Sequence, residues 1–279
     1  MKRRSFLAGS AALAARPRLH AAPPAEGKFQ LGCVTYNLLQ NMDLETLIHT
    51  LEATGFAAVE LRTGHKHGVE PSIGAEERAR VKERFARSKV RLLSYGSTCE
   101  FQSPDAAVRK KQIDTGKAFV DLARDTGAIA VKVRPNGFPA GVPHPTTIHT
   151  IAMGLRELGE YGQIKGIEIW MEVHGSGTQE PEVAAEILAM TANPNVGACW
   201  NSNPTDVKDG SVKQSFDLLG PYIRNCHINE LVSGYPYREL FRLLRGSGYS
   251  RYTLAEVAES KEPERFMRYY KALWEQLSA

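Results

Sequence analysis

This sequence has no heptad repeat, no collagen-like glycine period and, after its first residues, no apolar run long enough to cross a bilayer. It also lacks an excess of basic charge over most of its length. Five of the 35 lysines and arginines precede residue 26, and the remaining 30 are balanced by 31 acidic residues. A basic surface for nucleic acid is therefore not expected. The hydrophobic content of 42% instead predicts a globular protein.

Cysteine is scarce as well, with four residues and no CxxC pair. Cysteines of an exported protein can pair, and Cys199 and Cys226 fall on consecutive predicted strands. They face opposite sides of those strands, which disfavours a bridge between them. We therefore predict free, buried cysteines.

The first 25 residues are typical of an export signal. A basic start, Lys2-Arg3-Arg4, precedes a short run of small and apolar residues, and Arg3-Arg4-Ser5-Phe6-Leu7 resembles a twin-arginine signal. We expect residues 1–25 to be cleaved, which leaves a periplasmic protein of residues 26–279 with no membrane segment.

Eight short β-branched segments alternate with eight amphipathic segments over residues 26–279. The predicted strands are 31–36, 57–62, 90–95, 128–134, 166–173, 196–201, 223–228 and 252–257. The predicted helices are 43–54, 75–88, 105–126, 145–165, 181–192, 211–219, 237–245 and 263–277. This alternation and length predict an α/β protein with a single (β/α)8 TIM barrel. A doubly wound sheet would need a glycine-rich phosphate loop after the first strand, and CVTYNLLQNMD contains no glycine.

Polar residues occupy the carboxyl ends of the predicted strands, where a buried parallel strand is normally apolar. Successive side chains of a strand point to opposite faces, so polar residues two apart share one face, which we expect to be the inward face. The paired or single inward residues are Glu60 and Arg62, Lys132 and Arg134, Glu172 and His174, Asn201 and Asn203, His227 and Asn229, and Glu256. All of them are expected at the barrel mouth, where active sites of this fold lie.

Four of these residues, one from each of the last four strands, form a candidate cation site: Glu172, Asn201, His227 and Glu256. Oxygen ligands with one imidazole favour Mn²⁺ or Mg²⁺, with Co²⁺ or Zn²⁺ as further options. The alternative is a network of salt bridges without metal. The remaining inward polar residues are candidates for substrate binding: Glu60, Arg62, Lys132, Arg134, His174, Asn203 and Asn229.

Five short segments together resemble the xylose isomerase-like barrels, the sugar phosphate isomerase/epimerase group. They are VKVRPNG at 131–137, MEVHG at 171–175, ACWNSNPTD at 198–206, CHINE at 226–230 and LAEV at 254–257. The resemblance implies metal binding by Glu172, Asn201, His227 and Glu256. It also implies that Glu172 and Glu256 exchange a proton with the carbon beside a sugar carbonyl, through an enediolate.

The sequence departs from the family pattern in three places. Asn201 stands where an aspartate is usual, Pro204 where epimerases carry a histidine, and the arginine expected after the strand-seven histidine is missing from residues 231–234. The asparagine removes a negative charge and should weaken metal affinity.

The resemblance favours a metal-dependent isomerase or epimerase of a sugar or keto-sugar, with a small-molecule sugar as its partner. A lyase or dehydratase acting on 3-keto-glycosides or keto-inositols is the first alternative, because the same proton abstraction can expel a leaving group. A catalytically inactive carbohydrate-binding barrel is the second.

Overall fold

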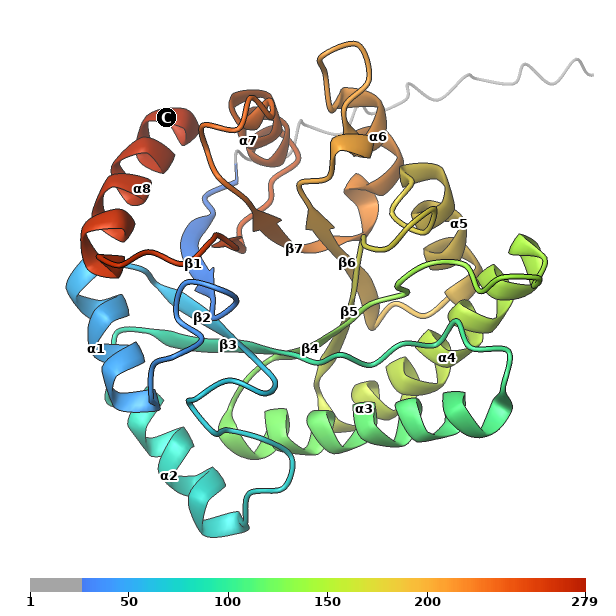
Figure 1. Cartoon of the computed structure of the whole chain (residues 1–279), viewed down its shortest axis with the longest axis horizontal. Coiled ribbons are helices and arrows are strands. Elements are labelled where there is room, and N and C mark those ends of the chain that lie inside the picture. The colour runs from blue at the N-terminus through green and yellow to red at the C-terminus, as the bar shows by residue number, and fades with distance from the viewer. Residues whose placement is uncertain (1–26) are drawn as a thin grey trace, which may run out of the picture.

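The computed structural model describes residues 27–279, in which eight parallel strands close into a barrel in chain order (Figure 1). The strands are β1 (Gln30–Val34), β2 (Ala58–Arg62), β3 (Arg91–Gly96), β4 (Ala130–Val133), β5 (Glu168–Glu172), β6 (Val196–Asn201), β7 (Ile223–Ile228) and β8 (Tyr252–Ala255). β1 pairs with both β2 and β8, which closes the cylinder. The predicted (β/α)8 barrel is thus confirmed.

One helix follows each strand, and the helices surround the barrel (Figure 1). They are α1 (Leu44–Thr54), α2 (Ala75–Ala86), α3 (Ala106–Thr126), α4 (His144–Lys165), α5 (Pro181–Thr191), α6 (Lys213–Leu219), α7 (Tyr237–Gly246) and α8 (Pro263–Ser278). The predicted signal, residues 1–25, lies outside the described residues, so cleavage and periplasmic location stay predictions. No helix within residues 27–279 has the length and apolarity needed to span a bilayer.

Local sequence explains where several helices begin and end. The Asp43 side chain accepts a hydrogen bond from the backbone of Thr46 at the start of α1, and Gly55 ends the helix in the left-handed conformation. α3 is bounded in the same way by Asp105 and Gly127. The aspartate caps thus lie on the side of the barrel mouth, and the glycine caps lie where the chain returns to the next strand.

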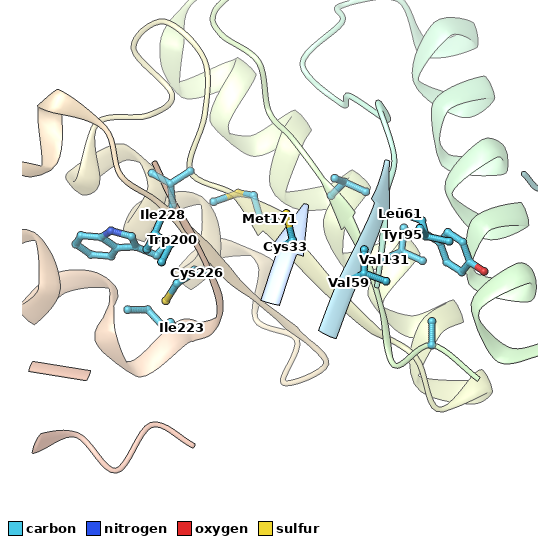
Figure 2. Packing of buried hydrophobic residues seen from close by; sticks show 14 of the residues in the cluster. Cys33, Val59, Leu61, Tyr95, Val131, Met171, Trp200, Ile223, Cys226 and Ile228 are labelled. Atoms are coloured by element: carbon cyan, nitrogen blue, oxygen red, sulfur yellow. The ribbon is translucent and has the colours of Figure 1, made fainter. Parts of the chain in front are cut away.

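Successive side chains of each strand point alternately toward the helices and into the barrel, so the apolar residues form two cores. Outward residues pack under the helices, and Figure 2 shows Val59, Leu61 and Tyr95 in one group with Trp200 and Ile223 in another. A second cluster fills the barrel interior and consists of Val34, Ala58, Leu93, Ala130, Trp170, Cys199 and Leu254. The interior is therefore a packed core rather than a pore.

The bulkiest interior residue is Trp170, which is 1% exposed and lies below the strand ends. Its Nε1 donates a 2.7 Å hydrogen bond to Glu168. Arg251 donates to both carboxylate oxygens of Glu168, at 2.7 and 2.8 Å. This bidentate pair holds Trp170 as a plug in the lower half of the barrel.

All four cysteines are buried and free, as predicted. Cys199 belongs to the interior cluster and Cys226 to the outer core. The two thiols therefore lie on opposite faces of neighbouring strands, which is the arrangement that argued against a bridge.

A buried carboxylate supports the loop that follows β6. Asp206 is 1% exposed and accepts hydrogen bonds from the Tyr235 hydroxyl at 2.7 Å and the Asn203 backbone at 2.9 Å. The Tyr235 hydroxyl in turn accepts from Trp200 Nε1 at 3.1 Å. Burial raises the pKa of Asp206 to about 7, despite these donors.

This raised pKa predicts a pH-dependent stability. The folded state holds the Asp206 proton more tightly than the unfolded state, so its contribution is complete below the unfolded pKa of 3.8 and is lost as pH rises through about 7. The loss should reach about 4 kcal/mol of unfolding free energy at most. Denaturant titrations from pH 4 to 8 should show a flatter profile for Asp206→Asn than for the wild type. Identical profiles would contradict this assignment.

Candidate metal centre and active site

The carboxyl ends of the strands surround a cavity of about 320 Å³. Its walls are formed by Val34, Tyr36, Asn37, Arg62, Lys132, Arg134, Glu172, His174, Asn201, Asn229, Glu256, Val257 and Ala258. Most of these side chains are polar. The predicted convergence of polar strand ends at the barrel mouth is thus what the structure shows.

Three of the four predicted ligands approach one another closely. Glu172, His227 and Glu256 each offer a ligand atom, and these atoms lie within 4.8 Å of one another. His227 Nδ1 is 3.4 Å from Glu172 Oε1 and 3.5 Å from Glu256 Oε2. His227 is fully buried beneath the two carboxylates.

Asn201 lies on the strand between Glu172 and His227. It is the register partner of His227 in the pairing of β6 with β7, and it lines the same cavity. Its Oδ1 is buried and has no hydrogen-bond partner within residues 27–279. An unpaired buried amide oxygen is costly and is therefore available to a ligand.

Lys132 forms a buried ion pair with Glu172, with 2.6 Å between Nζ and Oε2. Burial opposes both charges, but the mutual attraction is stronger: the pKa of Lys132 is raised and the pKa of Glu172 is lowered. Burial likewise opposes the imidazolium of His227, whereas Cys199, Glu60 and Glu256 raise its pKa. The cluster of negative charge is thus partly balanced by cations of the chain itself.

Glu60 lies deeper than predicted. It is fully buried, does not line the cavity, and places Oε1 3.4 Å from Nε2 of His227. Ser94 donates a 2.8 Å hydrogen bond to its other oxygen. A Cβ on Gly96 would come within 2.8 Å of Glu60 Oε1, so a larger residue there would displace this carboxylate. The prediction that Glu60 contacts substrate is corrected here, because its carboxylate faces the rear of His227.

A carboxylate behind a ligating histidine fixes the orientation of the ring and increases its basicity. We expect Glu60→Gln to weaken Mn²⁺ binding about 10- to 100-fold while the fold is kept. Calorimetric titration of metal-stripped protein measures this, with exposed Glu45→Gln as the control. Equal Mn²⁺ affinity in the Glu60→Gln and wild-type proteins would contradict this role.

The remaining predicted substrate residues lie around the cavity rim. The Arg62 guanidinium lies 5.1 Å from the centre of the Tyr36 ring. Arg134 pairs with Glu100 at 3.0 Å, and His174 has a buried Nδ1 without a partner in the described part of the chain. The strand pattern did not reveal Glu100, because it belongs to the loop after β3 rather than to a strand end.

The two asparagines predicted to bind substrate differ in their placement. Asn229 lines the cavity, although its amide also donates to the Ser202 carbonyl at 3.1 Å. Asn203 does not line it, because its amide donates to the Val173 carbonyl at 2.6 Å and the residue caps the 3₁₀ helix Pro204–Asp206. β6 ends at Asn201, so the alternation no longer applies at Asn203, and that assignment is corrected.

The donor set fits a divalent cation. Both ring nitrogens of His227 and Oδ1 of Asn201 lack a hydrogen-bond partner within residues 27–279, although carboxylates surround the ring. Together with Glu172 and Glu256 they offer oxygen and imidazole ligands, which suit Mn²⁺, Mg²⁺, Co²⁺ or Zn²⁺. An ion would have to displace Lys132 from Glu172 and a proton from His227.

Sequence comparison identifies the family. The family model for the xylose isomerase-like TIM barrel matches residues 48–273, so this chain belongs to that family. The resemblance seen in the strand-end motifs is thereby confirmed. No curated protein matches the chain in sequence.

Solved structures share the fold over nearly the whole chain. The IOLI protein with a bound zinc atom is 18% identical with a TM-score of 0.72, covering 90% of this chain and 96% of that one. D-Psicose 3-epimerase from Clostridium cellulolyticum H10 is 13% identical with a TM-score of 0.77, covering 90% and 99%. The E. coli 3-keto-D-glucoside 4-epimerase YcjR is 12% identical with a TM-score of 0.75, covering 89% and 100%. At these identities the likeness establishes the fold.

Proposed function

We propose that this protein is a divalent-metal-dependent isomerase or epimerase of a sugar or keto-sugar, acting by proton abstraction beside a carbonyl. The observation that carries the proposal is the convergence of Glu172, His227 and Glu256 on one point in the barrel mouth. Similar folds that include two sugar epimerases support the substrate class.

Glu172 and Glu256 are the proposed acid–base pair. They come from β5 and from the end of β8, and both line the cavity beside Asn201. Carboxylates on opposite sides of a bound sugar would remove a proton from one face and return it to the other, as epimerisation requires. A divalent ion held by Glu172, Asn201, His227 and Glu256 would supply a Lewis acid that stabilises the negative charge on the sugar oxygens.

Lys132, Arg62 and Arg134 are the proposed substrate-orienting groups. Each places a cationic side chain on the wall of the cavity, where it can donate hydrogen bonds to sugar hydroxyls or a carbonyl. His174 and Asn229 complete the polar wall. Lys132 would transfer its hydrogen bond from Glu172 to the substrate once Glu172 binds an ion.

A lyase or dehydratase is the second candidate. His174 favours it, because a half-buried imidazole beside Glu172, with one nitrogen unpaired within residues 27–279, is positioned to protonate a leaving group. A probable 3-DHS dehydratase from Bacillus anthracis also has this fold, with 13% identity and a TM-score of 0.69.

A hydrogen-exchange experiment tests the reaction class. The protein is incubated in heavy water with Mn²⁺ and a panel of ketoses and 3-keto-sugars, and deuterium beside the carbonyl is detected by NMR. We expect metal-dependent deuterium uptake with every carbon and oxygen of the sugar retained, whereas an elimination would release water or an aglycone. Mn²⁺ binding without any exchange would support the inactive binding barrel instead.

Asn201 provides a further prediction about the metal. Asn201→Asp adds a carboxylate at the usual family position and should raise Mn²⁺ affinity about tenfold or more, because the ligand set gains a negative charge. Calorimetry measures the change, and Asn41→Asp is the control because Asn41 is exposed and does not line the cavity. Weaker Mn²⁺ binding in Asn201→Asp would remove Asn201 from the ligand set.

A further inference from the structure

A second cavity lies beside the first in the barrel mouth. This outer pocket has a volume of about 580 Å³ and is formed by the loops after β3, β4 and β5. Arg134 and His174 line the inner cavity, while Asn136 and Ser176 line the outer pocket. Residues two apart in a chain lie within about 7 Å, so the two cavities are neighbours.

Glu100 connects the polar groups of the two cavities. Its Oε1 accepts hydrogen bonds from Arg134 Nε at 3.0 Å and from Asn136 Nδ2 at 2.7 Å. Its Oε2 accepts from Gln102 Nε2 at 2.9 Å. Arg134 belongs to the inner cavity, and Asn136 and Gln102 to the outer pocket. A continuous series of hydrogen-bonding groups therefore runs from the wall of the inner cavity to the outer pocket.

The outer pocket combines a pair of stacked aromatic rings with these polar groups. Phe138 and His144 stack with 3.8 Å between ring centres and an angle of 13° between the rings. Both residues line the pocket together with Gln102 and Asn136. The C–H face of a pyranose ring packs on an aromatic ring, and amides bind its hydroxyls, so this chemistry suits a sugar.

The loops that form the outer pocket are held in contact. A Cβ on Gly175 would come within 2.5 Å of Asn136 and Gly137, so the backbones of the two loops touch. The Gly137 backbone also donates a 2.8 Å hydrogen bond to the buried Thr178 hydroxyl. Such a pocket needs little rearrangement to bind a ligand, which favours affinity.

From these observations we infer that the outer pocket is a subsite for a second sugar ring, so that the substrate is a glycoside or disaccharide. The inference rests on the proposed function in one respect: it takes the inner cavity as the place of the reacting keto-sugar. The outer face of the Phe138–His144 stack would pack on the second ring, and Asn136 and Gln102 would bind its hydroxyls.

Two measurements on Mn²⁺-loaded protein test the subsite. The first compares the KM for 3-keto-trehalose with the KM for 3-keto-glucose, using the deuterium-exchange assay. Phe138→Ala should raise the KM for the disaccharide roughly tenfold and leave that for the monosaccharide within about twofold. His149→Ala, an exposed histidine on the same helix as His144, is the control and should change neither value.

The second measurement is saturation-transfer NMR with trehalose and glucose, which does not depend on turnover. We expect the wild type to bind trehalose more tightly than glucose, and Phe138→Ala to lose that preference. A wild type without the preference, or a preference unchanged in Phe138→Ala, would overturn the subsite. If neither keto-sugar exchanges deuterium while the trehalose preference depends on Phe138, the proposed function fails and the subsite stands.

Discussion

Replacement of Glu256 by glutamine is expected to lower the rate of deuterium exchange by about 10²- to 10⁴-fold, because the amide cannot accept the proton that the carboxylate removes. The side chain of Glu256 is 19% exposed, and its carboxylate lies 3.5 Å from His227. Glutamine preserves the size of the side chain and leaves the surrounding core intact. Exchange is measured by NMR, and the fold by circular dichroism.

Glu259→Gln is the matched control, since Glu259 is an exposed glutamate three residues further along the chain. It should exchange deuterium at the wild-type rate. If Glu256→Gln retained a rate within about threefold of the wild type, Glu256 would not be a general base or acid, and a single-base mechanism centred on Glu172 would have to replace the two-base one.

Replacement of Lys132 by methionine is expected to lower the free energy of unfolding by about 3–5 kcal/mol in EDTA, because it leaves a buried carboxylate without its partner. Lys132 and Glu172 are both buried, with side-chain exposures of 7% and 4%. Addition of Mn²⁺ should restore most of the lost stability, since the ion binds where the ammonium group was. Denaturant titrations with EDTA and with Mn²⁺ measure both effects.

The exposed pair of Lys110 and Asp114 serves as the control, with side-chain exposures of 75% and 52%. Lys110→Met should change the unfolding free energy by less than about 1 kcal/mol, as surface pairs are screened by water. A stability loss in Lys132→Met that Mn²⁺ does not reverse would show that the ammonium group and the ion do not share a site.

Much of the fold follows from sequence because local signals and periodicity agree. The predicted bounds of β6 and β7 coincide with the observed strands, and Asp43 and Asp105, the first residues of two predicted helices, cap those helices. Parallel strands bring their carboxyl ends to one edge, which is why the sequence alone predicts that Glu172 and His227 lie close together.

The site differs from its prediction for physical reasons that the alternation of side chains along a strand does not capture. A side chain that points into the barrel can lie at any depth along the barrel axis. Glu60 lies one inward position below Arg62, behind His227. Alternation also holds only while a strand continues, so Asn203, in the turn after β6, points elsewhere. Glu100 lies in a loop, whose conformation depends on long-range contacts with Arg134 and Asn136.

The plug formed by Trp170 has a consequence for isotope tracing. Because the buried indole and the Glu168–Arg251 pair lie in the barrel below the site, we expect water to reach Glu172 and Glu256 from the mouth. A sugar seated in that mouth would shut out bulk solvent, so a hydrogen removed by one carboxylate would in part return to the same face of the same molecule. Substrate recovered from heavy water would then carry less deuterium than the epimerised product, whose hydrogen comes from the second carboxylate, and this shortfall would measure how tightly the occupied barrel is sealed.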